Sequence, residues 1–397
     1  MIDLQQRLDE LDAQGLRRRM RVVESAQGPH VVIDGRSVLL LCSNDYLGLA
    51  DHPRVRAAAC DAALHWGTGS GASRLVSGTM TVHRQLEERL AAFKATESAL
   101  LFGSGYLANV GVISALAERG GVVFSDALNH ASIVDGCRLA RAETFVYDHC
   151  DVEHLAWGLS RAGDRSSLIV TDGVFSMDGD IAPLAEIVEL AARHRARVVV
   201  DDAHGTGTIG PGGRGAVAAA GVEGHVDVVL GTLGKALGSY GAFAACSATM
   251  AEFLVNRART LIFSTALPPP AVAAAHAALE LVEAEPDHVL RLQRNAAVLR
   301  GALGVDGETP IVPLVVGDPE RAVAACEAAL AGGVFAQAIR PPTVPDGTSR
   351  LRLTVMATHC ETDLVRAADV LKRAMYPQRG ADSPFPGVET PVAVGDR

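Results

Sequence analysis

Seven short apolar runs recur between residues 99 and 246, and each is followed by polar or glycine-rich residues. They lie at 99–102, 122–125, 144–147, 167–171, 197–201, 226–230 and 241–246. Apolar runs of this length without alternation are typical of strands that are buried on both faces. Helical stretches separate the runs, so the pattern predicts an α/β fold: a mostly parallel seven-stranded sheet with helices on both faces.

Other elements are predicted on the N-terminal side of this sheet. Leucines at positions 4, 8, 11 and 16 predict an amphipathic helix over residues 2–20. The segment HVVIDGRSVLLLCS predicts a hairpin that turns at Asp34 and Gly35. Helices are expected over residues 53–64 and over VHRQLEERLAAFK, and the glycine-rich residues 67–78 are expected to form an irregular loop between them.

After the sheet, prolines 268–270 open an alanine-rich helix toward residue 281, which we interpret as a connector. The segments IVPLVV, GVFAQAI and LRLTVM, with helices from about residue 320 and up to about residue 374, predict a small α+β domain. We therefore expect an N-terminal helix and hairpin segment (1–50), a large domain (51–270), a linker helix with the small domain (271–376), and a disordered tail (377–397).

Composition narrows the class of protein. Hydrophobic residues make up 48% of the 397 residues and charged residues 21%, without an apolar run of membrane-spanning length or a signal-peptide core, so a cytoplasmic protein is expected. A net charge of −10 without a basic patch argues against a nucleic-acid partner. The seven cysteines are scattered without a CxxC pair, so we expect reduced thiols and no metal site.

Parallel sheets bind ligands beyond the carboxyl ends of their strands, so the residues that directly follow each strand are the candidates for chemistry. The stretch GTLGKALGSYGA follows the run at 226–230 and places Lys235 among small residues. A partly desolvated lysine is an amine nucleophile that can form a Schiff base, so Lys235 is a candidate covalent anchor for a cofactor. The alternative is a surface lysine in a glycine turn.

Acidic and glycine residues follow the run at 197–201. Asp201 at the end of a buried strand needs a cationic partner, and a protonated pyridine nitrogen would be one, as in enzymes that use pyridoxal phosphate (PLP). The alternative is a capping or metal-binding pair with His204. HGTGTIG at 204–210 matches G-x-G-x-x-G, but PGGRG follows it instead of a helix, which argues against a dinucleotide site.

Further candidates lie at the same predicted edge. Gly105 and Tyr106 precede a helix whose free N–H groups suit a phosphate. His130, Ser176 and Thr232 also follow strands, although a lone histidine is more often structural and a serine here could be a turn residue. The convergence of these residues at one sheet edge is what favours a site.

An ordered set of motifs carries a family resemblance. It comprises SNDYLGL (43–49), GASRLVSGTMTVHRQLE (71–87), LNHAS (128–132), TDGVFSMDGDIAPL (171–184), VDDAHGTGTIGPGGRG (200–215), GTLGKALG (231–238) and RPPTVPDGTSRLRLT (340–354). Together these motifs closely resemble those of the α-oxoamine synthases. These are fold-type-I PLP enzymes that condense an amino acid with an acyl-CoA and release carbon dioxide. The resemblance covers residues 3–374 and implies the same fold and cofactor.

The resemblance also implies roles for individual residues. Lys235 would carry the cofactor as a Schiff base, Asp201 would pair with its pyridine nitrogen, and His130 would stack on its ring. The other cofactor contacts implied are Gly105, Tyr106, Ser176, His204, Thr232 and, from the neighbouring subunit of a homodimer, Ser264 and Thr265. The substrate contacts implied are Arg17, Asn44, His130, Thr343 and Arg352, with Arg352 as the carboxylate clamp.

Within the family, the GASRLVSG loop and the AIRPPTVP segment most resemble the member of biotin biosynthesis that joins L-alanine to a pimeloyl thioester, on CoA or on an acyl carrier protein. A sister synthase that uses glycine and acetyl-CoA is the alternative within the family. A cofactor-binding regulator without turnover is the alternative from another class. The tail extends past the usual end of the family.

Overall fold

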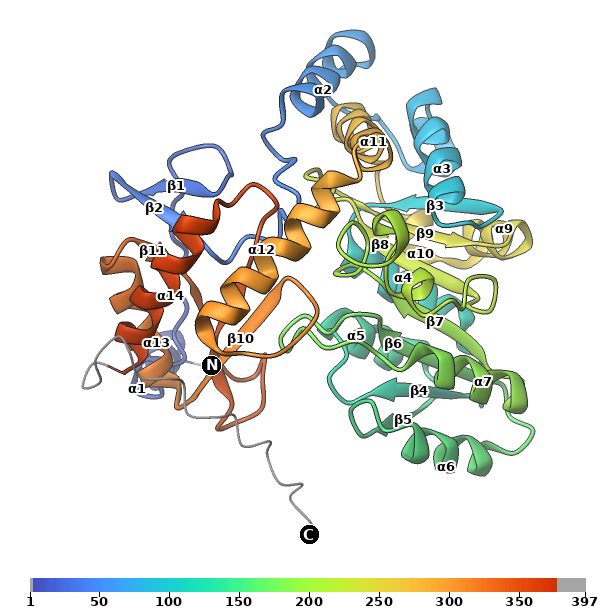
Figure 1. Cartoon of the computed structure of the whole chain (residues 1–397). Coiled ribbons are helices and arrows are strands. Elements are labelled where there is room, and N and C mark those ends of the chain that lie inside the picture. Colours follow the sequence, from blue (N-terminus) through green and yellow to red (C-terminus); the bar gives the residue numbers. More distant parts are fainter. Residues whose placement is uncertain (1–2, 377–397) are drawn as a thin grey trace.

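Seven strands form the central sheet of the computed structural model, which describes residues 3–376 (Figure 1). They are β3 (Ser98–Phe102), β4 (Val122–Asp126), β5 (Glu143–Tyr147), β6 (Ser167–Asp172), β7 (Arg197–Asp201), β8 (Val228–Thr232) and β9 (Ala242–Cys246). Their order is β3-β9-β8-β7-β6-β4-β5, and β9 runs antiparallel to both of its neighbours. The predicted fold class, a fold-type-I PLP enzyme fold with a mostly parallel sheet, is confirmed.

Helices cover both faces of this sheet, because its strands are apolar on both sides. One face packs against α3 (Thr81–Phe93), α6 (Val152–Ala162) and α7 (Leu184–His194). The other face packs against α4 (Gly105–Leu116), α5 (Ala131–Ala140), α9 (Ala248–Arg257) and α10 (Arg259–Ile262). Neighbouring residues of β4 belong to opposite cores, since Val123 joins the second and Phe124 the first.

The smaller lobe combines the two ends of the chain. The predicted hairpin forms β1 (His30–Ile33) and β2 (Arg36–Leu40), and Asp34 and Gly35 both have positive φ. Strand β2 pairs in parallel with β11 (Val334–Phe335), which attaches the hairpin to the C-terminal half. A second sheet orders β10 (Ile311–Gly317), β13 (Ser349–Thr354) and β12 (Gln337–Ile339), covered by α13 (Pro319–Ala331) and α14 (Glu361–Met375).

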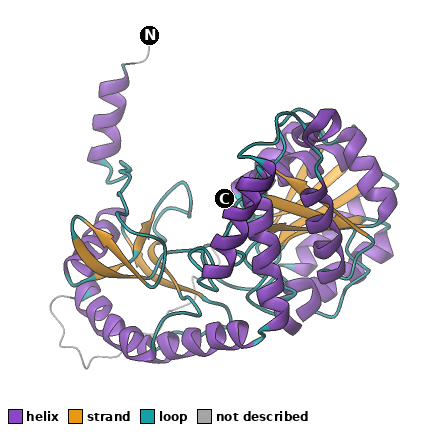
Figure 2. Cartoon of the chain, turned by 90° about the horizontal axis from the view of Figure 1, so that it is seen from above, coloured by secondary structure: helices purple, strands orange, loops and turns teal. Residues whose placement is uncertain are grey.

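Two N-terminal elements differ from the prediction. Helix α1 spans only Leu4–Ala13, because the chain turns at Gly15 with a φ of 64°, and the arginine cluster lies beyond the helix. None of the side chains of α1 is buried, and Figure 2 shows the helix standing away from both lobes. The loop at 67–78 follows α2 (Pro53–Trp66) and contains a short π-helix, η1 (Arg74–Gly78).

The connection between the lobes uses two helices instead of one. The alanine-rich helix is α11 (Pro269–Ala284), which packs against α2 and α3 in the larger lobe. After Pro286 a second helix, α12 (Asp287–Leu303), continues into the smaller lobe (Figure 1). We did not predict α12, although its buried Val289, Leu292, Ala296 and Leu299 have helical spacing.

The predictions about membranes and the tail have different outcomes. Among residues 3–376, no helix has the length and apolar character that crossing a membrane requires. The predicted tail at 377–397 lies outside the described residues.

Candidate active site

Acidic and polar residues end the central strands at one edge of the sheet. Asp126, Asp172, Asp201 and Thr232 are the last residues of β4, β6, β7 and β8, and Asp172 pairs in register with Asp201. Parallel strands deliver their carboxyl ends to the same edge, so these side chains gather there. The edge faces the smaller lobe, from which β13 contributes Arg352.

Lys235 lies in the turn after β8, where it is half-buried. Its Nζ is 2.7 Å from Nε2 of His204. Burial lowers the pKa of Lys235 to about 8, although Asp201 and Asp172 act in the opposite direction. Lys235 is therefore a more available amine near neutral pH than an exposed lysine, as expected for a Schiff-base anchor.

His204 connects Lys235 to a chain of hydrogen bonds. Burial, together with the charge on Lys235, lowers the pKa of His204 well below its usual value, so the ring is neutral. Its Nδ1 lies 2.7 Å from the hydroxyl of Tyr46, which donates to Oδ1 of Asn44 over 3.3 Å. A neutral ring that accepts from Lys235 and donates to Tyr46 satisfies every group in this chain.

Asp201 lies beside Lys235 and is held from two sides. One carboxylate oxygen accepts from Nδ2 of Asn109 at 2.5 Å, and the other accepts from the backbone N–H of Ala203 at 3.0 Å. Its neighbour Asp202 instead forms a buried ion pair with Nζ of Lys94 at 2.7 Å. The two adjacent carboxylates are thus separated in role, and Asp201 is the one within electrostatic reach of Lys235.

Close packing explains why glycines occupy their positions in HGTGTIG. A Cβ on Gly205 would lie 2.0 Å from Oδ1 of Asp202, and one on Gly207 would lie 2.5 Å from Cβ of Ala236. The glycines allow close packing around the buried ion pair and beneath the turn that carries Lys235. The motif is followed by a three-residue 3₁₀ helix, η2 (Pro211–Gly213), and not by the helix that a dinucleotide site requires.

His130 precedes α5 and is also close to this group. Its backbone N–H donates to Oδ2 of Asp172 at 3.0 Å, and its Nδ1 lies 2.7 Å from Oγ of Ser132. Burial lowers the pKa of His130, and the charges of Asp201 and Lys235 act on it in opposite directions. His130 is therefore neutral at physiological pH and lies within electrostatic range of both residues.

Arg352 is a site residue that comes from the smaller lobe. The buried guanidinium donates to the backbone carbonyl of Ser176, to Oδ1 of Asn44 at 3.2 Å and to the hydroxyl of Tyr46 at 3.4 Å. The predicted residues Asn44 and Ser176 are thus both in contact with Arg352. They connect through Tyr46 and His204 to Lys235.

The predicted phosphate-binding residues begin α4. Gly105 and Tyr106 form its first turn, and Ser104 caps the helix by accepting from the N–H of Leu107. The hydroxyl of Tyr106 donates to Asp135 at 2.5 Å, and the side chain is about half exposed. Thr232 lies at the end of β8, where its hydroxyl donates to the carbonyl of Gly241 at 3.1 Å.

Four predicted site residues lie outside this group. Ser264 and Thr265 line a small cavity together with Gly103, two residues before α4. Arg17 pairs with Asp12 and lines a cavity of about 780 Å³ beside Arg340, whose carbonyl accepts from the N–H of Thr343. Arg17 and Thr343 therefore gather around Arg340, and neither is among the hydrogen-bonded partners of Lys235, His204 or Arg352.

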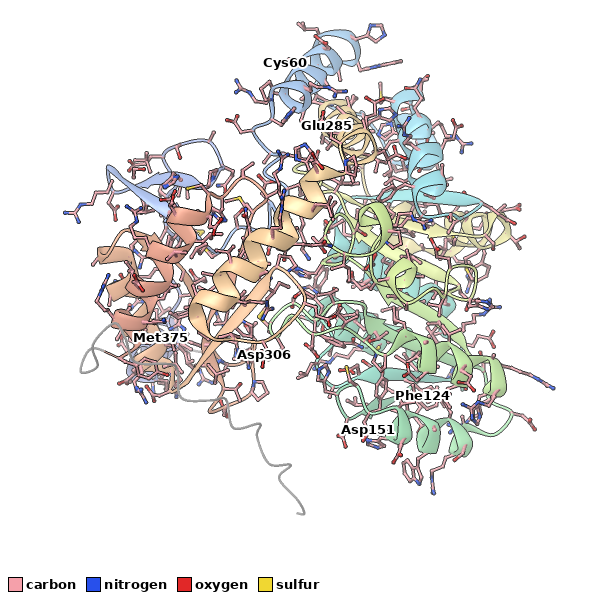
Figure 3. The ribbon with its side chains drawn as sticks, in the orientation of Figure 1. Cys60, Phe124, Asp151, Glu285, Asp306 and Met375 are labelled. Carbon is pink, nitrogen blue, oxygen red and sulfur yellow. The ribbon has the colours of Figure 1, made fainter. Side chains whose placement is uncertain are left out.

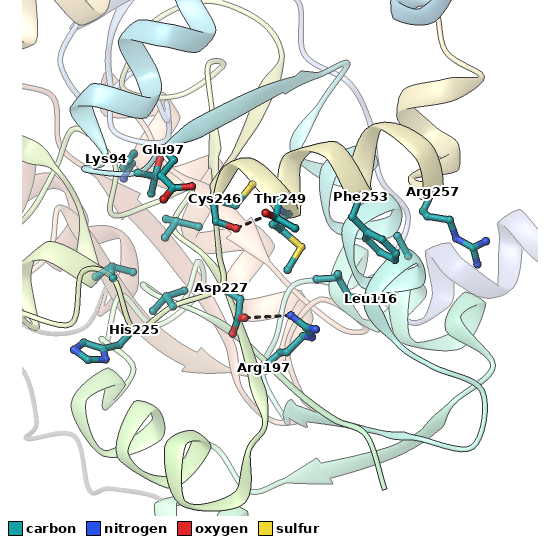
Figure 4. Close-up of a pocket in the computed structure, with 18 of the residues that line it drawn as sticks. Lys94, Glu97, Leu116, Arg197, His225, Asp227, Cys246, Thr249, Phe253 and Arg257 are labelled. Carbon is teal, nitrogen blue, oxygen red and sulfur yellow. Dashed lines mark hydrogen bonds and ion pairs between the residues drawn. The ribbon is translucent and has the colours of Figure 1, made fainter.

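A larger cavity of about 1160 Å³ lies elsewhere in the large lobe (Figure 4). Its lining includes Arg197, which begins β7 and pairs with Asp227 at 3.5 Å. It therefore lies at the amino end of the parallel strands, opposite the edge that carries Lys235, where this fold class does not place its chemistry.

Three residues of the site were not singled out from the sequence. Tyr46, Asn109 and Asp172 each contact one of the predicted residues. Asn109 was detectable as a polar residue on an otherwise apolar, buried stretch of α4. Tyr46 and Asp172 lie inside motifs that carry the resemblance, but their contacts depend on pairing across the fold.

Comparisons with known proteins agree with this geometry. Residues 36–371 match the aminotransferase class I and II family. The 8-amino-7-oxononanoate synthase of Geobacter sulfurreducens is 55% identical over 92% of this chain and 96% of its own, and that of Anaeromyxobacter dehalogenans is 56% identical over 89% and 90%.

Solved structures show the same fold. A serine palmitoyltransferase from S. paucimobilis, with a bound PLP–myriocin aldimine, superposes with a TM-score of 0.89 at 36% identity, covering 94% of this chain and 96% of its own. An 8-amino-7-oxononanoate synthase from Francisella tularensis superposes with a TM-score of 0.74 at 26% identity, covering 86% and 98%.

Fold and site together define a PLP-dependent α-oxoamine synthase, the class predicted from the motifs. Within the aminotransferase class I and II family, the chain belongs to the 8-amino-7-oxononanoate synthase family. The predicted family and enzyme class are confirmed.

Proposed function

We propose that this protein condenses L-alanine with a pimeloyl thioester in biotin biosynthesis. The Cα proton of alanine is removed, and a bond forms between Cα and the thioester carbonyl carbon as the thiol leaves. The alanine carboxylate then leaves as carbon dioxide, and a proton returns to Cα. The observation that carries the chemistry is the amine of Lys235, of lowered pKa, 2.7 Å from a neutral His204 and beside Asp201. The choice of substrates is supported by relatives of 55% identity.

The residues at the sheet edge fit PLP. An aldehyde needs an unprotonated amine, a pyridinium needs a buried carboxylate, and a phosphate needs free N–H groups at a helix start. Lys235, Asp201 and the first turn of α4 supply these three groups. When bound, PLP withdraws electrons from Cα of the amino acid and so stabilises the negative charge that attacks the thioester.

Lys235 has two tasks in this proposal. It would hold the cofactor covalently, and its amine can take the Cα proton of alanine as a general base. A pKa of about 8 suits both tasks, since the amine is partly unprotonated at neutral pH. His204 accepts a hydrogen bond from the amine, which orients the nitrogen lone pair.

Asp201, His130 and Arg352 hold the reacting groups. Asp201 would pair its carboxylate with the pyridine nitrogen of the cofactor, and Asn109 fixes the position of that carboxylate. His130 supplies a neutral ring against which the cofactor can stack. Arg352 offers a guanidinium fork for the alanine carboxylate, already positioned by Asn44 and Tyr46.

We also propose a homodimer that completes the site. Leu75 and Val76 on η1 and Phe263 after α10 are exposed by 54%, 79% and 70%. These elements adjoin, because Ser73 forms a β-bridge with Thr265. An apolar surface of this kind beside the start of α4 suits a second copy of the chain, which would present Ser264 and Thr265 toward the neighbouring phosphate.

A panel of substrates tests the function. The purified holoenzyme would be assayed with alanine, glycine and serine against pimeloyl-, acetyl- and palmitoyl-CoA, with products identified by mass. We expect alanine with pimeloyl-CoA to give the highest kcat/KM and 8-amino-7-oxononanoate as product. The serine pairs are included because the serine palmitoyltransferase fold is so similar. A preference for glycine with a short acyl-CoA would transfer the assignment to a sister synthase and leave the PLP chemistry intact.

A further inference from the structure

A histidine outside the reacting group bridges two loops of the active-site edge. His149 lies between β5 and α6, two residues before Asp151, which Figure 3 labels. Its Nδ1 is 2.9 Å from Oδ1 of Asp126, and its Nε2 is 2.5 Å from Oδ2 of Asp180.

The two carboxylates require the ring to carry both of its protons. An ionised carboxylate can accept hydrogen bonds but cannot donate them. Each ring nitrogen of His149 must therefore be the donor in its contact. Burial alone would lower the pKa of His149, but the hydrogen bonds to Asp126 and Asp180 outweigh it and raise this pKa to about 12.

The carboxylate of Asp126 stabilises the turn that leads to His130. Oδ1 of Asp126 also accepts from the N–H of Leu128 at 2.8 Å, and Oδ2 accepts from the N–H of Cys150 at 2.8 Å. The turn from 127 to 130 is therefore tied to the β5–α6 loop through one carboxylate. His130 ends this turn, and its backbone N–H donates a hydrogen bond to the carboxylate of Asp172.

The second carboxylate belongs to the loop that carries Ser176. The carbonyl of Asp180 accepts from the N–H of Phe175, and the ring of Phe175 meets His149 edge-on with centroids 4.4 Å apart. In the same loop, the backbone carbonyl of Ser176 accepts a hydrogen bond from Arg352, and Asp178 forms an ion pair with Arg350. Both arginines lie on β13. His149 thus lies between the His130 turn and the loop that contacts the smaller lobe.

We propose that His149 is a positioning residue, which fixes the His130 turn against the Ser176 loop so that His130 and Arg352 are held at the site together. It touches neither substrate nor cofactor, and it acts through Asp126 and Asp180. The proposal rests on the proposed function, because it assigns His130 and Arg352 to the same reaction.

The test compares His149→Phe, which keeps a ring against Phe175 but donates no hydrogen bond, with His154→Phe as the matched control. His154 lies in α6 and contacts Asp148 without joining the two loops. For His149→Phe holoenzyme we expect an altered visible circular dichroism of bound PLP and a kcat at least about tenfold lower, since small misplacements of catalytic groups cost up to about 100-fold. The His154→Phe variant should keep both.

A double-mutant cycle separates positioning from general stability. In a His130→Ala background, His149→Phe should cause a much smaller loss of kcat than in the wild type, because one target of its action is gone. Asp180→Ala, which removes the acceptor at the other end of the same bridge, should reproduce the spectral change if His149→Phe folds poorly. Full additivity, or an unchanged circular dichroism in both variants, would overturn the proposal. A wild type that binds PLP but does not condense alanine would instead refute the proposed function, and the spectra would still test His149.

Discussion

At the scale of single residues, the chemistry depends on the surroundings of two side chains, those of Lys235 and Asp201. Desolvation lowers the pKa of Lys235 and makes its unprotonated amine available, and hydrogen bonds from Asn109 and a backbone N–H fix the carboxylate of Asp201. Three predictions follow from these two environments.

Lys235→Ala should abolish the visible absorbance of covalently bound PLP and leave the protein folded, because the side chain engages the site and not the apolar core. Absorbance spectra with borohydride treatment, together with far-UV circular dichroism, measure both. A variant that retained the absorbance and full activity would show that another group anchors the cofactor.

Asp201→Asn should leave PLP bound but slow exchange of the Cα proton of alanine on the order of 100-fold or more, since loss of a preorganised charge costs about 3 kcal/mol in the transition state. Exchange into deuterated water, followed by NMR, needs no acyl donor. An unaltered exchange rate would remove the role from Asp201.

The lowered pKa of Lys235 makes capture of PLP dependent on pH. Only the unprotonated amine reacts, so the rate at which the apoenzyme binds PLP covalently should rise with pH through about 8, well below the usual range of lysine. Because Asp201 raises this pKa, Asp201→Asn should move the midpoint to lower pH. Stopped-flow absorbance across a pH series measures it, and a midpoint near 10 would contradict the burial argument.

At the scale of elements, a buried ion pair ties α3 to the strand that carries Asp201. Nζ of Lys94, one residue beyond α3, contacts Asp202 and Thr206 at 2.7 Å and the carbonyl of Arg214 at 2.6 Å. Both charged side chains of the pair are almost fully buried. The pair fixes the chain just after β7 and turns Asp202 away from the site.

Lys94→Met should therefore destabilise the fold by about 3–5 kcal/mol, because it leaves the charge of Asp202 buried without a partner. Denaturant unfolding of the apoprotein measures this loss. Lys372→Met on α14 is the control, and it should change the free energy of unfolding by less than about 0.5 kcal/mol. Equal effects of the two substitutions would show that the pair contributes nothing specific.

At the scale of the whole molecule, the fold is shared by proteins of different names. The fold superposes better on a serine palmitoyltransferase than on an 8-amino-7-oxononanoate synthase structure, whereas the curated relatives of 55% identity are 8-amino-7-oxononanoate synthases. The same fold thus carries proteins named for different reactions, and a fold alone does not decide which reaction is performed.

The choice of acyl donor is the prediction at this scale. Arg17 lies with Arg340 around a cavity of about 780 Å³ between the N-terminal segment and the smaller lobe. If an anionic donor passes there, Arg17→Ala should raise the KM for pimeloyl-CoA several-fold and leave the KM for alanine unchanged. Arg7→Ala on the exposed face of α1 is the control. An equal change in both KM values would place Arg17 outside the donor path.

The sequence by itself determined the sheet, the hairpin and the candidate chemistry of this protein. Buried parallel strands are continuous apolar runs, and the residues that follow them meet at one edge, so Lys235, Asp201 and His204 could be grouped before any coordinates. Only the tertiary structure decided that β2 pairs with β11, that Asp202 faces Lys94 instead of the site, and that Tyr46, Asn109 and His149 support their neighbours. These contacts join residues that are distant in the chain. The local pattern of apolar and polar residues does not determine which distant groups will come into contact.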